Sequence, residues 1–406
     1  MSEAASTLLM APIQVASAGF GLLLTGLAAA GWAGLRGRGF AALAGAAGLA
    51  LAASWLTPRA ALLFLAALAP AYVATRWLWG RPERAGAPAV AALIVWQIAL
   101  LAATKLGGWS QQLGLAGVVG LSYLTFRQIH LLLFAARRPK GERFDPALWL
   151  SYLVNPWTLL AGPVANYDAH AKALAGMARP DGEEILAAAH RVATGLVKVL
   201  VLAPIFSGQG DVAALARPDA GWRDGLVVFY AYYVFLFLDF SGYCDLVIGA
   251  ARLAGFRGVP ENFDRPYLAA NLQDFWNRWN ITLGLWFRAH VFTPLLATLM
   301  RRWGVGKQDA AIALSLVAVF VLIGLWHGLA WNYALFGLIH AVGVAGAYLL
   351  RQGIVRRRGA AALKAWEANR WMRPLRILAC QHAVAASFIL LDNDVAAILA
   401  LFGRPA

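Results

Sequence analysis

His327 is the side chain in this sequence that offers acid–base chemistry most directly. It ends a strongly apolar run, AAIALSLVAVFVLIGLW, and Gly324 and Gly328 flank it. Imidazole accepts a proton near neutral pH, which is what a general base requires. The flanking glycines leave room for the close approach of another chain or a ligand. The pattern therefore indicates either a general base or a structural histidine bonded to a neighbouring helix.

A second stretch, PENFDRPYLAANLQDFWNRWN at 260–280, interrupts the apolar pattern with polar and aromatic residues. Pro260 and Pro266 break helices, and Asn271 is a suitable N-cap for a helix that begins directly after it. Trp276 and Asn280 are four residues apart, so on a continuous helix they share a face. The helix then presents the Asn280 amide inward while its aromatic residues hold it at a membrane interface. These aromatic residues are Phe275, Trp276 and Trp279.

Acidic residues gather just before and within this stretch. Asp239 and Asp245 lie inside or at the edge of an apolar run, where an ionisable group needs a partner or a function. Arginines that could pair with them follow within the next forty residues or so. We expect a structural ion-pair network that ties loops to helices. Its expected members are Asp239, Asp264, Arg265 and Arg278.

Other catalytic chemistries find no support in the sequence. No HExxH or similar spacing predicts a metal site, and Cys244 and Cys380 are too few for a disulfide framework. No GxxxxGK[ST] phosphate loop or GxGxxG motif occurs, and Ser241 in DFSGY lacks the context of a nucleophile elbow. We therefore expect neither a metal site nor a covalent enzyme intermediate.

The elements that must position these residues are membrane helices. Of the 406 residues, 61% are hydrophobic and 14% charged, whereas soluble domains are about 45–50% apolar and about 25% charged. One membrane span needs about 20 apolar residues, so the chain has room for about ten to twelve transmembrane or re-entrant helices. We predict an all-α polytopic integral membrane protein, a helix bundle forming a single domain over residues 1–406.

The apolar runs lie at about 11–35, 39–57, 60–75, 87–104, 112–136, 147–166, 185–206, 225–250, 284–300, 309–326, 329–350 and 376–402. Some runs are short for a span, and those at 60–75, 147–166 and 284–300 contain Pro, Asn or Arg, so these three are compatible with tilted, interfacial or re-entrant segments.

The formal net charge of +15 comes from 35 basic and 20 acidic residues. In a soluble protein it would suggest nucleic acid, but in a membrane protein basic residues gather in cytoplasmic loops, and we exclude nucleic acid as a partner. Basic residues follow the first, third and fifth runs, which places the loops at 36–38, 76–84 and 137–143 in the cytoplasm and the N-terminus outside. No cleavable signal peptide is evident, so we expect the first span to serve as the insertion signal.

Six short elements, taken in order, resemble the membrane-bound O-acyltransferase superfamily. The sequence is most similar to its bacterial branch, which holds alginate O-acetyltransferases and the D-alanyl transferases of teichoic acid. The resemblance covers residues 120–345, the expected family core. The matching elements are GLSYLTFRQIH at 120–130, AGP at 161–163, DFSGYCDLVIGAARLAGF at 239–256, PENFDRPYLAANLQDFWNRW at 260–279, WFR at 286–288 and LWHG at 325–328.

The resemblance implies transfer of an acetyl or D-alanyl group from a cytoplasmic thioester donor to a hydroxyl of a cell-envelope or secreted polysaccharide. By carry-over, His327 is the catalytic base and Asn280 occupies the second family position, where bacterial members usually carry histidine and eukaryotic members asparagine. The donor is a substrate, coenzyme A or a phosphopantetheine carrier protein, and no permanently bound cofactor is expected. The site lies in a central tunnel or funnel. Its expected substrate-binding residues are Trp276, Trp279, Arg278, Asp274 and Trp326.

The expected location is the bacterial cytoplasmic (inner) membrane. The expected partners are the acyl carrier protein or acyl-CoA, the glycan acceptor, the lipid bilayer and an extracytoplasmic acyltransferase. Three other functions stay open at this point: a transporter or flippase for a lipid-linked glycan, an acyltransferase for a small lipid acceptor, and a catalytically inactive scaffold. Neither the acyl group nor the acceptor can be identified from the sequence.

Overall fold

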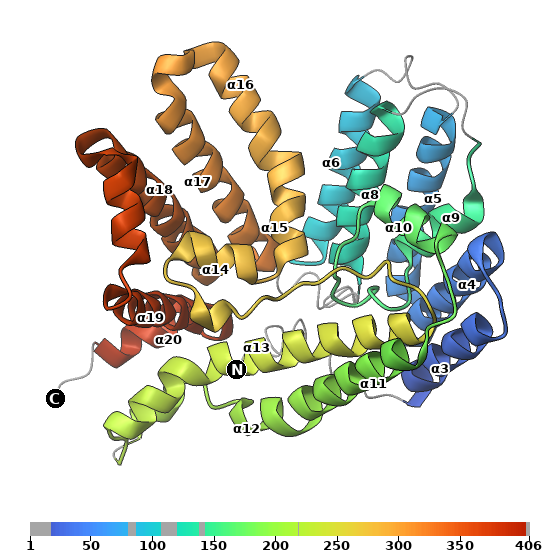
Figure 1. Ribbon diagram of the computed structural model, residues 1–406, viewed down its shortest axis with the longest axis horizontal. Helices are drawn as coiled ribbons and strands as arrows, with labels where there is room; N and C mark the ends of the chain where they lie inside the picture. Colours follow the sequence, from blue (N-terminus) through green and yellow to red (C-terminus); the bar gives the residue numbers. More distant parts are fainter. Residues whose placement is uncertain (1–17, 80–86, 107–119, 138–142, 218, 403–406) are drawn as a thin grey trace. The chain divides into compact units, whose positions relative to one another are not determined.

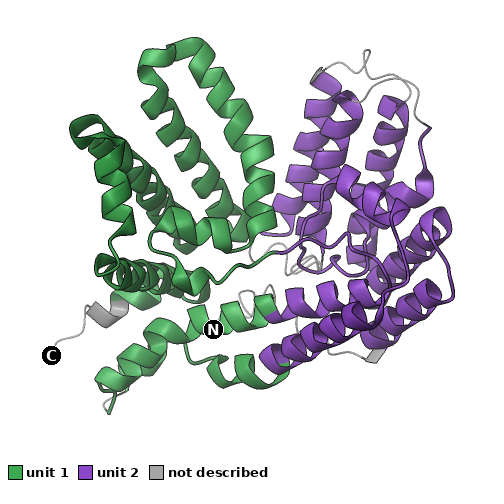
Figure 2. Ribbon diagram, viewed as in Figure 1, with its two compact units in different colours: residues 1, 200–241, 262–406 green, residues 2–199, 242–261 purple. Residues whose placement is uncertain are grey.

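The computed structural model describes residues 18–79, 87–106, 120–137, 143–217 and 219–402, and these form helices joined by turns and loops (Figure 1). The chain divides into two compact units (Figure 2). Unit 1 comprises residues 200–241 and 262–406, and unit 2 comprises residues 2–199 and 242–261.

Unit 2 packs its helices closely enough that a glycine is required at one contact. Helix α4 lies against the short helix α9, and a Cβ at Gly48 would overlap the carbonyl oxygen of Val154. A fully buried arginine, Arg127, donates to the carbonyl oxygen of Leu153 at 2.7 Å and to Oγ1 of Thr158 at 2.6 Å, which compensates for its burial. The helices of unit 2 are α3 (Ala18–Trp32), α4 (Gly37–Trp55), α5 (Pro58–Trp79), α6 (Ala87–Ala103), α8 (Leu121–Arg137), α9 (Pro146–Leu153), α10 (Tyr167–Ala175) and α11 (Gly182–Leu196).

Unit 1 is built around an antiparallel hairpin of α17 (Gln308–His327) and α18 (Trp331–Ala368). Helix α19 (Met372–Asp392) packs on α18, and the short helix α14 (Leu272–Arg278) packs on both. The glycines Gly324 and Gly337 face each other across the hairpin, where a Cβ on either would overlap backbone atoms of the other helix. The remaining elements are α12 (Ala203–Phe206), η3 (Val212–Ala216), η4 (Pro266–Leu268), α15 (Ile281–Phe287), η5 (Arg288–Phe292), α16 (Thr293–Trp303), η6 (Val305–Lys307) and α20 (Val395–Phe402).

Two elements carry residues of both units. Helix α13 (Trp222–Leu253) belongs to unit 1 up to residue 241 and to unit 2 from residue 242. The π-helical turn η2 (Val197–Leu202) divides between residues 199 and 200.

Eight helical segments of the described chain are long and apolar enough to cross a membrane, and two shorter apolar helices, Gly19–Trp32 and Pro88–Ala103, accompany them. The protein is therefore an all-α, multi-pass membrane protein, as the sequence predicts. The eight segments are Gly37–Trp55, Pro58–Trp79, Gly182–Phe206, Trp222–Leu253, Ile281–Trp303, Val305–His327, Trp331–Ala368 and Met372–Asp392.

The three apolar runs that contain Pro, Asn or Arg have different outcomes. Those at 60–75 and 284–300 belong to segments of 22 and 23 residues, which are long enough to span. The run at 147–166 forms only the eight residues of α9 and then turns. Several predictions about topology fall on residues 1–17, 80–86, 107–119 and 138–142, which lie outside the described residues: the side of the N-terminus and parts of the 76–84 and 137–143 loops.

Candidate active site

Asn280 lies between two short helices, in a left-handed backbone conformation. Asn271 caps α14 as predicted, because its Oδ1 accepts from the backbone N–H of Asp274 at 2.9 Å. The helix then ends at Arg278, and Asn280 adopts φ 44° and ψ 51° as the N-cap of α15. Asparagine tolerates this conformation better than most residues. The prediction that Trp276 and Asn280 share a face of one helix is therefore wrong, since Asn280 lies outside α14.

The side chain of Asn280 is held by a second buried asparagine, Asn262. Nδ2 of Asn262 donates to Oδ1 of Asn280 at 3.1 Å. Oδ1 of Asn262 accepts from the backbone N–H of Thr282 at 3.0 Å and from its hydroxyl at 2.8 Å. The exposed fractions of Asn262 and Asn280 are 1% and 5%. Asn262 has no predicted role, although it lies in the PENF segment that carries part of the resemblance.

This arrangement fixes which way the Asn280 amide points. A backbone N–H only donates, so the atom of Asn262 that faces Thr282 must be its oxygen. The NH₂ of Asn262 therefore faces Asn280, and Asn280 must offer its oxygen in return. Consequently the NH₂ group of Asn280 points away from Asn262, as a hydrogen-bond donor held in one orientation.

His327 is the last residue of α17, and the chain leaves the helix at Gly328 in an extended conformation. The ring is half-buried, with the indole of Trp326 at 4.6 Å between centroids and Phe336 edge-on at 5.6 Å. The ring of Tyr333 occupies the space where a Cβ of Gly328 would lie. The glycine is thus required by the packing of the turn directly after His327.

His327 and Asn280 border one aromatic cluster of unit 1. Phe336, which contacts the His327 ring, lies 5.7 Å from Phe388, and Phe388 lies 5.3 Å from Trp279, the residue before Asn280. Trp279 is buried and also stacks on Phe275 at 5.4 Å. The cluster therefore links the two sequence-predicted catalytic positions through contacts within one unit.

Trp276 is held by another buried histidine, His340. Its indole Nε1–H donates to Nδ1 of His340 at 3.1 Å, and Nε2 of His340 lies 2.9 Å from Oγ of Ser387. An indole N–H only donates, so Nδ1 carries no proton and Nε2 donates to Ser387, whose hydroxyl donates to the carbonyl oxygen of Val384 at 2.8 Å. His340 is therefore a neutral imidazole with both nitrogens engaged. Its sequence context gave no signal for this role.

The charged residues of the 260–280 stretch pair mainly with one another. Arg278 donates to Asp274 at 2.8 Å and lies 3.4 Å from a carboxylate oxygen of Asp264, which also pairs with Arg265 at 3.2 Å. These contacts connect α14 to the preceding loop. Asp239, expected in the same network, forms no ion pair or hydrogen bond within the described residues and is 5% exposed.

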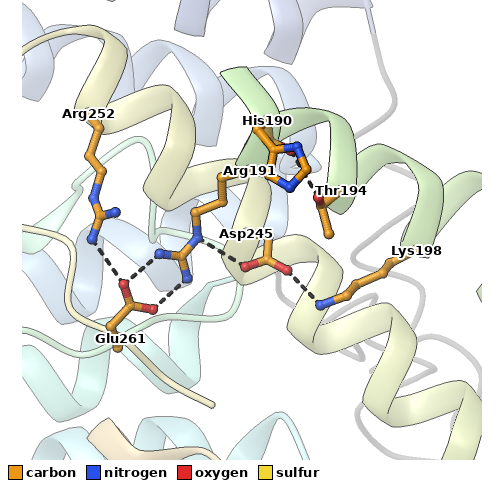
Figure 3. Close-up of polar contacts among 7 residues, drawn as sticks. All are labelled: His190, Arg191, Thr194, Lys198, Asp245, Arg252 and Glu261. Atoms are coloured by element: carbon orange, nitrogen blue, oxygen red, sulfur yellow. Dashed lines mark hydrogen bonds and ion pairs between the residues drawn. The ribbon is translucent and has the colours of Figure 1, made fainter. Parts of the chain in front are cut away.

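A second ion-pair network lies in unit 2 (Figure 3). Asp245 accepts from Arg191 at 3.0 Å and from Lys198 at 2.7 Å, and Glu261 pairs with Arg191 and with Arg252. The hydrogen bond from Arg191 holds the pKa of Glu261 below its ordinary value. The network joins α11, α13 and the loop that leads to the 260–280 stretch.

The fold and the site define the class of the protein: a multi-pass membrane protein with a polar site among its helices. The site consists of a histidine and an oriented amide next to one aromatic cluster. Comparison with known proteins narrows this class. The chain matches the membrane-bound O-acyltransferase (MBOAT) family over residues 53–356 and belongs to it. It is an O-acyltransferase.

The chain is similar to acyltransferases of three kinds. It is 28% identical over 290 residues to the teichoic acid D-alanyltransferase of Streptococcus thermophilus, a match that covers 69% of each chain. It is 32% identical over 164 residues to a probable alginate O-acetylase of Azotobacter vinelandii, covering 40% of this chain and 30% of the relative. It is 31% identical over 151 residues to the peptidoglycan O-acetyltransferase of Helicobacter pylori, covering 37% and 27%.

Proposed function

We propose that this O-acyltransferase moves an acetyl or D-alanyl group from a thioester donor to a hydroxyl of a cell-envelope or secreted polysaccharide. The observation that carries the proposal is the fixed amide of Asn280, held by Asn262 beside the aromatic cluster that His327 also contacts. A donor held in one orientation is what a developing oxyanion requires. The names of the relatives, which act on teichoic acid, alginate and peptidoglycan, support a polymer acceptor.

In the proposed reaction, His327 takes the proton of the acceptor hydroxyl as its oxygen attacks the thioester carbonyl. The Asn280 amide donates to the carbonyl oxygen while negative charge develops there. The carbon–sulfur bond then breaks, and the thiolate leaves with the bonding electron pair. The protonated His327 then donates its proton to the thiolate. The products are an ester and a thiol, and no acyl-enzyme forms.

The surroundings of these residues suit the exclusion of water, which would hydrolyse the thioester. We assign Trp276, Trp279 and Trp326 to the wall of a tunnel or funnel. Arg278 and Asp274 belong to the same substrate-binding region, and Asp264 and Arg265 support it.

The donor is coenzyme A or a phosphopantetheine carrier protein on the cytoplasmic side of the bacterial inner membrane, where basic loops attract phosphate groups. The N-terminus lies outside, where an extracytoplasmic acyltransferase would be the partner. We treat residues 1–406 as one functional domain, because the family match at 53–356 draws on both units.

Release of ester-linked acids by mild alkali tests the proposal. Envelope and secreted glycan are compared from cells carrying the native protein, no protein, His327→Ala, or His190→Ala, an exposed histidine of α11 that serves as matched control. We expect one acid, acetate or D-alanine, in the native and His190→Ala samples only. If all samples match although the native protein is expressed, polymer acylation is wrong, and a small lipid acceptor, transport or scaffolding takes its place.

A further inference from the structure

A group of acidic and phenolic side chains lies near the turn after His327. The amide of Asn332, at the start of α18, donates to the carbonyl oxygen of Leu390 at 2.9 Å, which ties this turn to the end of α19. Asp392 and Tyr333 are near neighbours in sequence of the two bonded residues, and they therefore lie close together. Tyr333 is also the residue whose ring covers Gly328, next to His327.

Helix α13 contributes two more members of the group. Tyr232 and Asp239 are seven residues apart on this helix, which places them on one face. Asp239, Asp392 and Tyr333 are the acidic and phenolic neighbours of the Tyr232 hydroxyl. A Cβ on Gly210 would lie 2.8 Å from Cβ of Tyr232 and 3.3 Å from Oδ2 of Asp392, so these two side chains flank the same backbone segment.

Three of these polar groups find no partner in the part of the chain that the structure describes. The Tyr232 hydroxyl is buried without a hydrogen bond, and the residue is 5% exposed. Asp239, equally buried, forms no hydrogen bond or ion pair among the described residues, and the carboxylate of Asp392 forms none there either. A buried carboxylate without a partner is costly, and an ionisable residue inside a membrane segment is therefore a candidate functional site.

We propose that Asp392, Asp239 and the hydroxyls of Tyr232 and Tyr333 form a binding site for a primary ammonium group of a substrate. An ammonium offers three N–H donors and one positive charge, which matches carboxylate and phenolic oxygens that have no basic partner in the described chain. A metal ion fits less well, because the described residues contain no group of three or more acidic, histidine or cysteine side chains placed to hold one.

The proposal rests on the proposed function, since it makes the site part of substrate recognition beside His327. Two substrates could carry the ammonium: the acyl group, as an α-amino group, or the acceptor, as an amino sugar. Transfer of an aminoacyl group, or transfer to an amino sugar, would use this site. Transfer of an acetyl group to a neutral glycan would not.

Binding tests the site without reference to transfer. Purified full-length protein is titrated with D-alanine methyl ester and with methyl propanoate, which has the same ester but no ammonium, and thermal stability is followed. We expect stabilisation by the ammonium ester alone, lost in Asp392→Asn and in Tyr232→Phe, which removes only a hydroxyl. Asp219→Asn, at a side chain that is 82% exposed, is the charge control and should behave as the native protein does. Equal responses to both esters overturn the site, whether or not the protein transfers acyl groups.

Transfer identifies which substrate carries the ammonium. The specificity ratio is measured for D-alanyl against acetyl thioester on a neutral glycan, and for glucosamine against N-acetylglucosamine glycosides with the acetyl donor. In Asp392→Asn one ratio should fall by about 30-fold or more, the effect of leaving a buried charge without its partner. A fall in the first ratio assigns the ammonium to the acyl group, and in the second to the acceptor. If transfer proceeds and both ratios stay constant, the site is overturned while the proposed function stands.

Discussion

Replacement of Asn262 by alanine removes both the support of α15 and the restraint on the Asn280 amide. Three buried hydrogen bonds are lost: one to the Asn280 oxygen and two from Thr282. Buried neutral hydrogen bonds each contribute about 0.5–1.5 kcal/mol net, so we expect Asn262→Ala to lose about 3 kcal/mol of stability. Thr282→Val keeps the side-chain shape and the backbone bond, and should lose about 1 kcal/mol. Unfolding of both variants in one detergent gives the comparison.

Asn262→Ala should slow transfer less than a substitution that removes the Asn280 amide. Asn280→Gly deletes the donor but keeps the left-handed backbone, and should slow transfer about 10²–10³-fold, as loss of one oxyanion donor does. Asn262→Ala leaves the amide in place but lets it rotate, so the loss is limited to about 1 kcal/mol of orientation, which is about 5-fold.

A double-mutant cycle decides whether Asn262 acts through Asn280. In the Asn280→Gly background, Asn262→Ala should destabilise the fold but cause no further loss in kcat. If Asn262→Ala slows transfer equally in both backgrounds, the two residues act independently, and the restraint that Asn262 places on the Asn280 amide has no role in catalysis.

Three further predictions concern support of the site and of unit 2. His340→Phe should lower transfer because it removes the acceptor for the Trp276 indole, whereas His340→Asn, whose Oδ1 can replace Nδ1, should restore part of it; equal kcat and KM for the two variants would contradict the role. The pKa of Glu261 is held below its ordinary value of 4.5, so the folded state binds this proton less tightly than the unfolded state does. The ionised carboxylate of Glu261 therefore stabilises the fold above about pH 4.5, and this stabilisation is lost as the pH falls through the lowered pKa. Glu261→Gln should therefore lower the unfolding temperature at neutral pH but much less in acid, and a difference that is constant with pH would argue against the ion pair. Gly48→Ala should lower the yield of folded protein and its unfolding temperature, because the added methyl overlaps the backbone of α9; Gly26→Ala, at an open position of α3, is the control.

The helices of this protein can be predicted from the sequence because burial in a membrane depends on the summed hydropathy of many residues. A run such as 309–326 reads as a span without knowledge of its neighbours, and α17 at Gln308–His327 agrees with it. The cap at Asn271 is also local, since its acceptor and the N–H that it binds are three residues apart. What could be predicted rests on interactions within one segment.

The features that sequence analysis missed depend on contacts between distant segments or on a single dihedral angle. Asn280 lies outside the preceding helix because its own φ is positive, and the periodicity of the sequence does not reveal this angle. Asp245 pairs with Arg191 and Lys198, 54 and 47 residues earlier, whereas arginines that follow it in the sequence were its expected partners. His340 receives its hydrogen bond from a tryptophan 64 residues away. Roles of this kind follow from packing, which the order of residues alone does not specify.

Asparagine at position 280 has a chemical consequence for the site. An amide does not titrate, so its NH₂ group donates in the same way across the range in which an imidazole gains or loses a proton. A histidine at this position would compete with His327 for the role of base and would change its own charge as the pH changed. Asn280 is fixed by Asn262, and both nitrogens of His340 are engaged by Trp276 and Ser387, so in the proposed mechanism neither side chain acts as the base and we assign the acid–base step to His327. The proposed mechanism thus gives oxyanion stabilisation to Asn280 and proton transfer to His327, so that a single histidine is sufficient as the base.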